Sequence, residues 1–264
     1  VARLCMADLA TVSLAPGEVA GAPIPDVCVN VRHPIPACMA SQYAGWQIKH
    51  DQFFAMGSGP MRAAAGKEKL FDEIGFLEQP QVAVGVLEAA QLPEYDAVLE
   101  IARQVNVAPQ HLILGIAPTA SIAGGVQVVA RSVETALHKL HELKFDLKRI
   151  VGGLGSAPLP PVAEDDMKAI GRTNDAVLYG ASVTLFAVGD DDTLAETAAA
   201  LPSSASRDYG KPFGELFKQY DYDFYQIDPM LFSPASVSLQ NIMTGRTHHA
   251  GSINAELLEA SFFN

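Results

Sequence analysis

The strongest structural signal begins at Leu112-Ile-Leu-Gly-Ile-Ala-Pro-Thr-Ala-Ser-Ile-Ala-Gly-Gly125 and continues as far as Leu143. Its apolar start, residues 112–117, predicts a strand, and the residues that follow up to Gly125 predict a loop. From Val126 to Leu143 the apolar residues recur at helical spacing, so one long amphipathic helix is expected there. Strand, loop and helix in succession indicate an α/β or α+β protein.

Segments on both sides continue this alternation of short apolar runs and helical patterns. Strands are expected at residues 11–14, 47–56, 81–87 and 236–243, with one long or two short strands at 176–188. Helices are expected near residue 61 and at 94–106, 191–200 and 212–220, with a last one from residue 255; Asp191 and Asp192 would cap the third. The glycine-rich segment Gly152-Gly-Leu-Gly-Ser-Ala-Pro158 predicts a loop.

Composition limits the possible classes of protein. The 264 residues fit one large or two modest domains, and 49% apolar with 18% charged residues exclude a disordered or coiled-coil chain. Eighteen basic against thirty acidic residues give a net charge of −12, which disfavours binding to nucleic acid. The uncharged run 112–130 is interrupted by proline and glycine, so it does not predict a membrane span.

The cysteines and the start of the chain carry two further expectations. Cys5, Cys28 and Cys38 are odd in number and form no C-x-x-C pair, so neither a disulfide framework nor a zinc site is expected. A reducing cytoplasm fits this cysteine usage best. The chain opens at Val1 without methionine, in what resembles the middle of a helix, so an N-terminal segment is expected to be missing.

Several familiar site motifs are absent from the sequence. It has no P-loop, no G-x-G-x-x-G between strand and helix, no G-x-S-x-G and no H-E-x-x-H. His138 and His141 stand one helical turn apart, as metal ligands do, but no third ligand is evident. We therefore predict no metal site.

Arg131 and Glu134 form the most suggestive pair of charged residues. They lie one helical turn apart, where the apolar stripe of the expected helix meets its polar face. One interpretation is an ordinary ion pair on a helix surface, worth roughly 0.2–0.5 kcal/mol. The other is a carboxylate held ionised by a guanidinium in a cleft, where it could act as a general base. Spacing alone leaves both open.

Two turns of similar sequence offer backbone N–H groups to an anion. Gly57-Ser-Gly-Pro60 and the glycine-rich loop at 152–158 both end in a Ser-x-Pro pattern, and each could bind carboxylate or phosphate oxygens or simply form a tight turn. Basic residues near such loops could hold an anionic part of a ligand or be solvated; they are Arg62, Arg172, Arg207 and Lys211.

A set of motifs occurs in a fixed order along the chain: Ser41-Gln-Tyr-Ala-Gly-Trp-Gln-Ile48, Phe54-Ala-Met-Gly-Ser-Gly-Pro-Met-Arg62, Ala117-Pro-Thr-Ala-Ser-Ile122, Arg131-Ser-Val-Glu-Thr-Ala136, Thr173-Asn-Asp175, Ser206-Arg-Asp-Tyr-Gly-Lys-Pro-Phe213, and Tyr222-Asp-Phe-Tyr225 with Ile227-Asp-Pro229. Together they closely resemble the methenyltetrahydromethanopterin cyclohydrolase family, over essentially the whole chain. Family members carry a further N-terminal segment.

The resemblance implies a reversible hydrolysis in one-carbon metabolism. Water adds to the methenyl carbon between N5 and N10 of the pterin, and the ring opens to the N5-formyl product. Because the substrate is itself cationic, neither a metal nor a covalent nucleophile is required, and tetrahydromethanopterin serves as the one-carbon carrier rather than as a permanently bound cofactor. Glu134 matches the catalytic carboxylate and Arg131 its partner; ion pairing would lower the pKa of Glu134 and burial would raise it.

The resemblance also implies two α/β domains with the substrate in a cleft between them, a homotrimer and a cytoplasmic enzyme without nucleic-acid or membrane partners. We place the domains at residues 1–115 and 116–264. Substrate contacts are then expected from the glycine-rich turns and nearby polar or basic residues: Ser58, Gly59, Arg62, Ser121, Arg172 and Lys211.

Other functions stay open beside this one. The same reaction on a folate cofactor usually comes with a dinucleotide-binding fold, whose fingerprint is missing here. A non-catalytic pterin- or anion-binding protein, or a purely structural trimer subunit, would not need both Arg131 and Glu134. The sequence leaves open the pterin variant and the physiological direction of the reaction.

Overall fold

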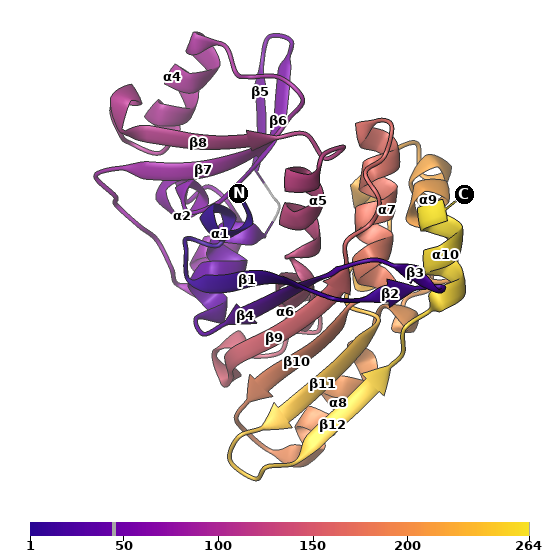
Figure 1. Cartoon of the computed structure of the whole chain (residues 1–264). Helices are drawn as coiled ribbons and strands as arrows, with labels where there is room; N and C mark the ends of the chain where they lie inside the picture. Colours follow the sequence, from indigo (N-terminus) through magenta and orange to yellow (C-terminus); the bar gives the residue numbers. More distant parts are fainter. Residues whose placement is uncertain (44–45, 264) are drawn as a thin grey trace.

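The structure is a computed structural model that describes residues 1–43 and 46–263. Helices and strands alternate along the chain and build two mixed sheets, which confirms the predicted α/β class (Figure 1). None of the helices in these residues combines the length and apolar character needed to cross a membrane.

The larger sheet has six strands in the order β1-β4-β9-β10-β11-β12. Only β10 and β11 run parallel; the other neighbours are antiparallel. A two-stranded ribbon of β2 and β3 extends from it (Figure 1). The strand bounds are β1 (Ala10–Ala15), β2 (Glu18–Val19), β3 (Ala22–Pro23), β4 (Asp26–Val31), β9 (Ile150–Pro158), β10 (Ser182–Ala187), β11 (Ser236–Asn241) and β12 (Thr247–Gly251).

The smaller sheet has four strands in the order β5-β6-β7-β8, of which only β7 and β8 are parallel. The bounds are β5 (Trp46–His50), β6 (Phe53–Ser58), β7 (Ala83–Glu88) and β8 (Leu112–Ala117), with α2 (Met61–Ala65), α3 (Lys69–Ile74), α4 (Tyr95–Gln104) and η2 (Pro109–His111) between them. The single strand expected at 47–56 was wrong. It is a hairpin that turns at Asp51, whose φ of 47° lies in the left-handed region.

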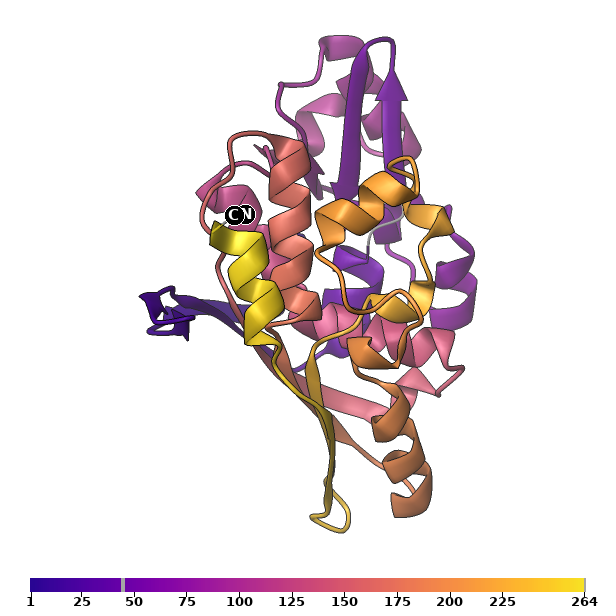
Figure 2. The same cartoon turned by 90° about the vertical axis from the view of Figure 1, so that its right-hand side faces the viewer.

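Most helices cover one face of the six-stranded sheet, while none of the helices in residues 1–43 and 46–263 covers its opposite face (Figure 2). This helix layer contains α5 (Ile122–Val129), α6 (Ser132–Glu142), α7 (Asp166–Leu178), α8 (Asp191–Ala200), α9 (Phe213–Gln219) and α10 (Ala255–Phe263). Short 3₁₀ turns join these elements: η3 (Leu147–Arg149), η4 (Ser203–Ala205), η5 (Phe224–Gln226) and η6 (Pro229–Leu231). Asp190, rather than the expected Asp191 or Asp192, caps α8 by accepting a 2.9 Å hydrogen bond from Thr193.

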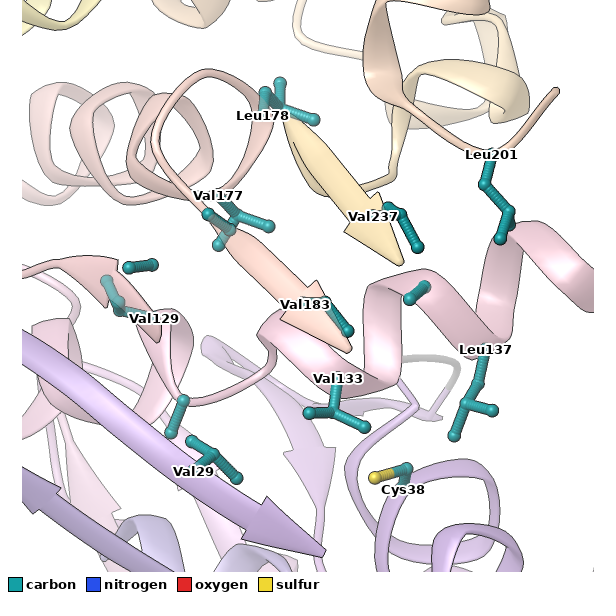
Figure 3. Packing of buried hydrophobic residues seen from close by; sticks show 14 of the residues in the cluster. Val29, Cys38, Val129, Val133, Leu137, Val177, Leu178, Val183, Leu201 and Val237 are labelled. Carbon is teal, nitrogen blue, oxygen red and sulfur yellow. The ribbon is translucent and has the colours of Figure 1, made fainter. Parts of the chain in front are cut away.

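The main core forms where α6 packs between the large sheet and η1 (Ile35–Gln42), an eight-residue π-helix. Val133 and Leu137 of α6 lie close to Val29 of β4 and Cys38 of η1 (Figure 3). Each fully buried aliphatic side chain contributes roughly 1.5–3 kcal/mol. The packing holds the first turn of α6 rigidly against the end of η1. A short helix, α1 (Ala2–Cys5), completes this side.

The expected helix 126–143 is in fact two helices, α5 and α6, that break at Ala130 and Arg131. The expected loop 152–158 is part of strand β9. A Cβ atom on Gly155 would lie 2.4 Å from the Ser132 hydroxyl and 3.1 Å from a Val133 methyl. Glycine in this strand therefore lets the start of α6 pack directly on the sheet.

Residues 176–188 also differ from the prediction of strand throughout: residues 176–178 end helix α7, and only Ser182–Ala187 form a strand. The predicted domain division at residue 115 stays a prediction. Strands β1 and β4 precede it but pair with β9, which follows it.

Candidate active site

The Arg131–Glu134 pair lies at the start of α6, facing the end of η1. Arg131 is the residue before the helix and Glu134 lies in its first turn. The Arg131 Nε atom donates a 3.1 Å hydrogen bond to Glu134 Oε2, and their side chains are only 15% and 4% exposed. The positive end of the helix dipole favours a carboxylate at this place. The pair is therefore buried, which an ordinary ion pair on a helix surface would not be.

Gln42, the last residue of η1, joins this pair from the opposite side. Its backbone oxygen accepts a 2.5 Å hydrogen bond from Arg131 Nη2, and its side-chain Nε2 donates a 3.3 Å bond to the Ala130 oxygen. Because a carbonyl oxygen can only accept, this bond sets the orientation of the amide. The Gln42 Oε1 atom is buried and has no hydrogen-bond partner among the described residues. It can therefore accept one further hydrogen bond.

Two thiols, a phenol and an imidazole near the pair are neutral at physiological pH. Burial raises the pKa of Cys5 and of Cys38, and it raises the pKa of Tyr43, which the charge of Glu134 also raises, to about 12. Burial lowers the pKa of His138. The thiols, the phenol and the imidazole are therefore uncharged, and neither cysteine offers the thiolate that nucleophilic catalysis needs.

Arg131 keeps its charge despite this environment. Burial lowers its pKa, but the nearby charges of Glu134 and Glu88 raise it above the ordinary value. The site therefore holds a permanent guanidinium against a carboxylate.

Arg62 is also buried, and its hydrogen bonds go to Glu68 and to backbone oxygens of η1. Its Nε and Nη2 atoms bind both oxygens of Glu68 at 3.0 and 2.6 Å. Its Nη1 atom donates to the backbone oxygens of Met39 and Ala40 in η1, at 3.1 and 3.2 Å. Arg62 and Arg131 thus both bind carbonyl groups at the C-terminal end of η1, where a helix dipole favours positive charge.

Ser58 and Gly59 lie beside Arg62 and likewise contact η1 and its neighbours. The Cys5 thiol donates a 3.2 Å hydrogen bond to the Ser58 hydroxyl, and the Gly59 N–H donates a 2.8 Å bond to the Ser41 oxygen. Gly59 has a φ of 90° and lies close to the backbone of Gly85, so no other residue fits easily. The structure brings Ser58, Gly59 and Arg62 together around η1.

The other predicted contact residues lie elsewhere. Ser121 caps α5 by accepting a 3.0 Å hydrogen bond from Gly124, and it lines a small cavity of about 40 Å³ together with Arg172. Arg172 donates to the backbone oxygens of Pro161 and Ser261. Lys211 is exposed, and its Nζ atom lies 3.2 Å from an oxygen of Gln219.

Sequence reasoning missed Gln42 and Glu88 as members of the site. Gln42 belongs to the quoted motif Ser41–Ile48, which was the only signal for it; Ala44 and Gly45 of that motif lie outside the described residues. Glu88 is the last residue of strand β7, and no motif or spacing in the sequence indicated it.

A larger cavity of about 590 Å³ lies between β5, α4 and Tyr225, and neither Arg131 nor Glu134 lines it. The described residues contain no cluster of three or more His, Cys, Asp and Glu side chains that could hold a metal ion.

The cyclohydrolase (MCH) family model matches residues 1–262. The chain therefore belongs to this family and is a hydrolase.

Named relatives are similar over almost the whole chain. A methenyltetrahydromethanopterin cyclohydrolase of Rhodopirellula baltica is 48% identical over 267 residues, 99% of this chain and 80% of the relative. The protein of that name from Methylosinus trichosporium is 47% identical over 259 residues, 98% of this chain and all of the relative. An archaeal one, from Methanococcoides burtonii, is 40% identical over 264 residues, 99% of this chain and 82% of the relative.

Proposed function

We propose that this protein reversibly hydrolyses 5,10-methenyl-tetrahydromethanopterin to N5-formyl-tetrahydromethanopterin, with Glu134 as the general base. The observation that carries the proposal is the buried Arg131–Glu134 contact of 3.1 Å in a member of the cyclohydrolase family. The names of the similar proteins support the choice of substrate.

The chemistry needs few groups because the substrate supplies its own electrophile. Glu134 takes a proton from a water molecule as the water oxygen attacks the methenyl carbon, and a neutral hydroxyl adduct forms. The adduct then loses its hydroxyl proton, N10 gains a proton, and the bond between the carbon and N10 breaks. The products are the N5-formyl compound and one proton, so atoms and charge balance.

Arg131 and Gln42 would position the water. Glu134 uses Oε2 for Arg131, which leaves Oε1 for the water. The unpartnered Gln42 Oε1 atom is a second acceptor beside the same pair. Two acceptors that bind the two water hydrogens would direct an oxygen lone pair toward the substrate carbon, which is the orientation that attack requires.

The remaining predicted residues would act at the edge of the site. We propose that Ser121 and Arg172, which line one small cavity, and Lys211 contact outer parts of the substrate. Ser58, Gly59 and Arg62 would position η1 and, through it, Gln42.

Glu134→Gln tests the general base. The change keeps the size of the side chain but removes the basic oxygen, so we expect turnover to fall about 10²–10⁴-fold with the fold unchanged. Loss of the methenyl absorbance measures turnover, and circular dichroism checks the fold. Glu142→Gln at the far end of the same helix is the matched control and should retain near-normal turnover.

The outcomes separate the alternatives. A Glu134→Gln protein with normal turnover would exclude this role for Glu134. A wild-type protein that binds the pterin without turnover would favour a binding protein, and turnover of the methenyl-folate analogue instead would favour a folate enzyme.

We also propose a homotrimer in the cytoplasm. The helix-free face of the six-stranded sheet supports the assembly, because uncharged side chains surround a shallow depression of about 370 Å³ there: Thr11, Ser13, Cys28, Asn30, Leu154, Ser156, Ser182 and Thr184. In a chain with a net charge of −12, an uncharged face is where copies can meet with least repulsion.

A further inference from the structure

Glu88 is a second carboxylate at the same site. It is the last residue of β7 and pairs with Ala117 at the end of the parallel strand β8. The carboxyl ends of these two strands open on one edge of the small sheet, and the chain continues from β8 into α5 (Figure 1). Two residues before Glu88, the Val86 N atom lies 3.3 Å from where a Cβ atom on Gly59 would be, and the Gly59 N–H donates a hydrogen bond to the oxygen of Ser41, the neighbour of Gln42. The end of β7 therefore lies beside the end of η1, and the charge of Glu88 also raises the pKa of Arg131.

One hydrogen bond holds the Glu88 side chain in place. The hydroxyl of Thr119, which is buried in the loop after β8, donates to Glu88 Oε1. Glu88 itself is only half-buried, so its other oxygen can face a ligand. Within the described residues, the ion pairs of the site leave Glu88 without a cationic partner.

The charges near the site therefore do not cancel. Arg131 neutralises Glu134, and Arg62 neutralises Glu68 in the same way. Glu88 remains as one uncompensated negative charge. A partly buried carboxylate of this kind is stabilised by a ligand that carries a single positive charge.

We infer that Glu88 is the counter-charge for the cationic substrate, and that it makes the site prefer the methenyl cation over the neutral formyl product. The inference rests on the proposed function, in which the two ligands differ by one positive charge. Thr119 is a positioning residue that orients this carboxylate. The role of Glu88 is distinct from that of Glu134, which accepts the proton.

Glu88→Gln tests the inference by binding rather than by rate. Both ligands are mixed rapidly with the wild type and with Glu88→Gln, and binding is measured before turnover, so that Glu134 keeps the charge that pairs with Arg131. We expect the Kd of the methenyl cation to rise about tenfold, because one screened charge interaction is lost. The Kd of the neutral formyl compound should change less than twofold.

Two further variants test whether the effect depends on the charge of Glu88 and on its position. Glu256→Gln removes the same charge from an exposed position on α10 and should leave both Kd values unchanged. Thr119→Val keeps Glu88 but removes its hydrogen-bond donor, and should weaken binding of the cation selectively by a smaller factor. It also tests the inference if the Glu88 variant does not fold.

The result also separates this inference from the proposed function. Equal weakening of both ligands by Glu88→Gln would show a structural role, and no change in either would exclude Glu88 from the site; both overturn the inference. Turnover of the methenyl compound by the wild-type protein establishes or refutes the proposed function independently of these values.

Discussion

At the scale of single residues, Asp175 has an unusual environment outside the Arg131–Glu134 pair. It lies in α7, packed against α9, and accepts a 2.8 Å hydrogen bond from the backbone N–H of Phe213. Burial raises its pKa from 3.8 to about 7, even though hydrogen bonds from Ser261 and Phe213 oppose the shift. The folded protein therefore binds a proton at Asp175 that the unfolded chain releases at lower pH.

This shift predicts a pH dependence of stability. Between about pH 4 and pH 7 the folded state holds more protons than the unfolded state, so the contribution of Asp175 falls as pH rises through this window. Asp175→Asn should remove the loss and stabilise the protein at pH 8 by on the order of 2 kcal/mol. Urea unfolding at pH 5 and pH 8 measures the free energy of unfolding of the wild type and the variant. Asp192→Asn, on an exposed part of α8, is the control, and equal behaviour of the two variants would contradict the prediction.

Arg131 and Glu134 show what spacing can and cannot reveal. The i,i+3 spacing of Arg131 and Glu134 predicted their contact, which the structure confirms at 3.1 Å. Spacing could not distinguish a buried pair from an exposed one, because burial depends on η1, almost ninety residues away. Gln42 binds Arg131 only because the fold brings η1 to the start of α6.

At the scale of elements, α6 packs directly against β9. Glycine at position 155 leaves room for Ser132 and Val133 at the start of α6. The same three-residue segment, Ser132 to Glu134, carries the proposed general base. Packing and chemistry are therefore coupled in this helix.

Gly155→Ala should disturb both the packing of α6 and the activity. Its Cβ atom would lie 2.4 Å from the Ser132 hydroxyl, so α6 must shift, and we expect a loss of about 1–3 kcal/mol of stability together with reduced turnover. Gly115→Ala makes the same change in β8, where the nearest atom lies 3.6 Å away, and should change stability by less than about 0.5 kcal/mol. Thermal unfolding compares the two variants. A Gly155→Ala protein as stable and active as the control would refute the coupling.

At the scale of the whole molecule, the helix-free sheet face is the surface on which the proposed homotrimer depends. Thr184 lies within its uncharged patch, on the central strand β10. Thr184→Lys would place a charge there that a contact between copies must desolvate. We expect this variant to give a smaller species than the wild type in light scattering.

Ala199→Lys, on the exposed surface of α8, adds the same charge on the other side of the sheet and should not change the assembly. A wild-type protein that is monomeric in solution would refute the trimer. A trimeric Thr184→Lys protein would show that copies meet through a different surface.

The sequence by itself determined the fold class, the strands β1, β7, β8 and β11, the helices α4, α8, α9 and α10, the family and the Arg131–Glu134 pair. These features depend on local periodicity, on turn residues and on motifs whose residues are neighbours in the chain. It did not reveal that residues 152–158 form a strand, because glycine normally indicates a turn and only the approach of α6 explains it there. Tertiary structure alone decided that Gln42 of η1 binds Arg131 and that the end of β7, with Glu88, lies beside the end of η1; both residues lie far from Arg131 in the chain. The physical reason is that burial and electrostatic contact depend on distance in space, whereas sequence patterns report only distance along the chain.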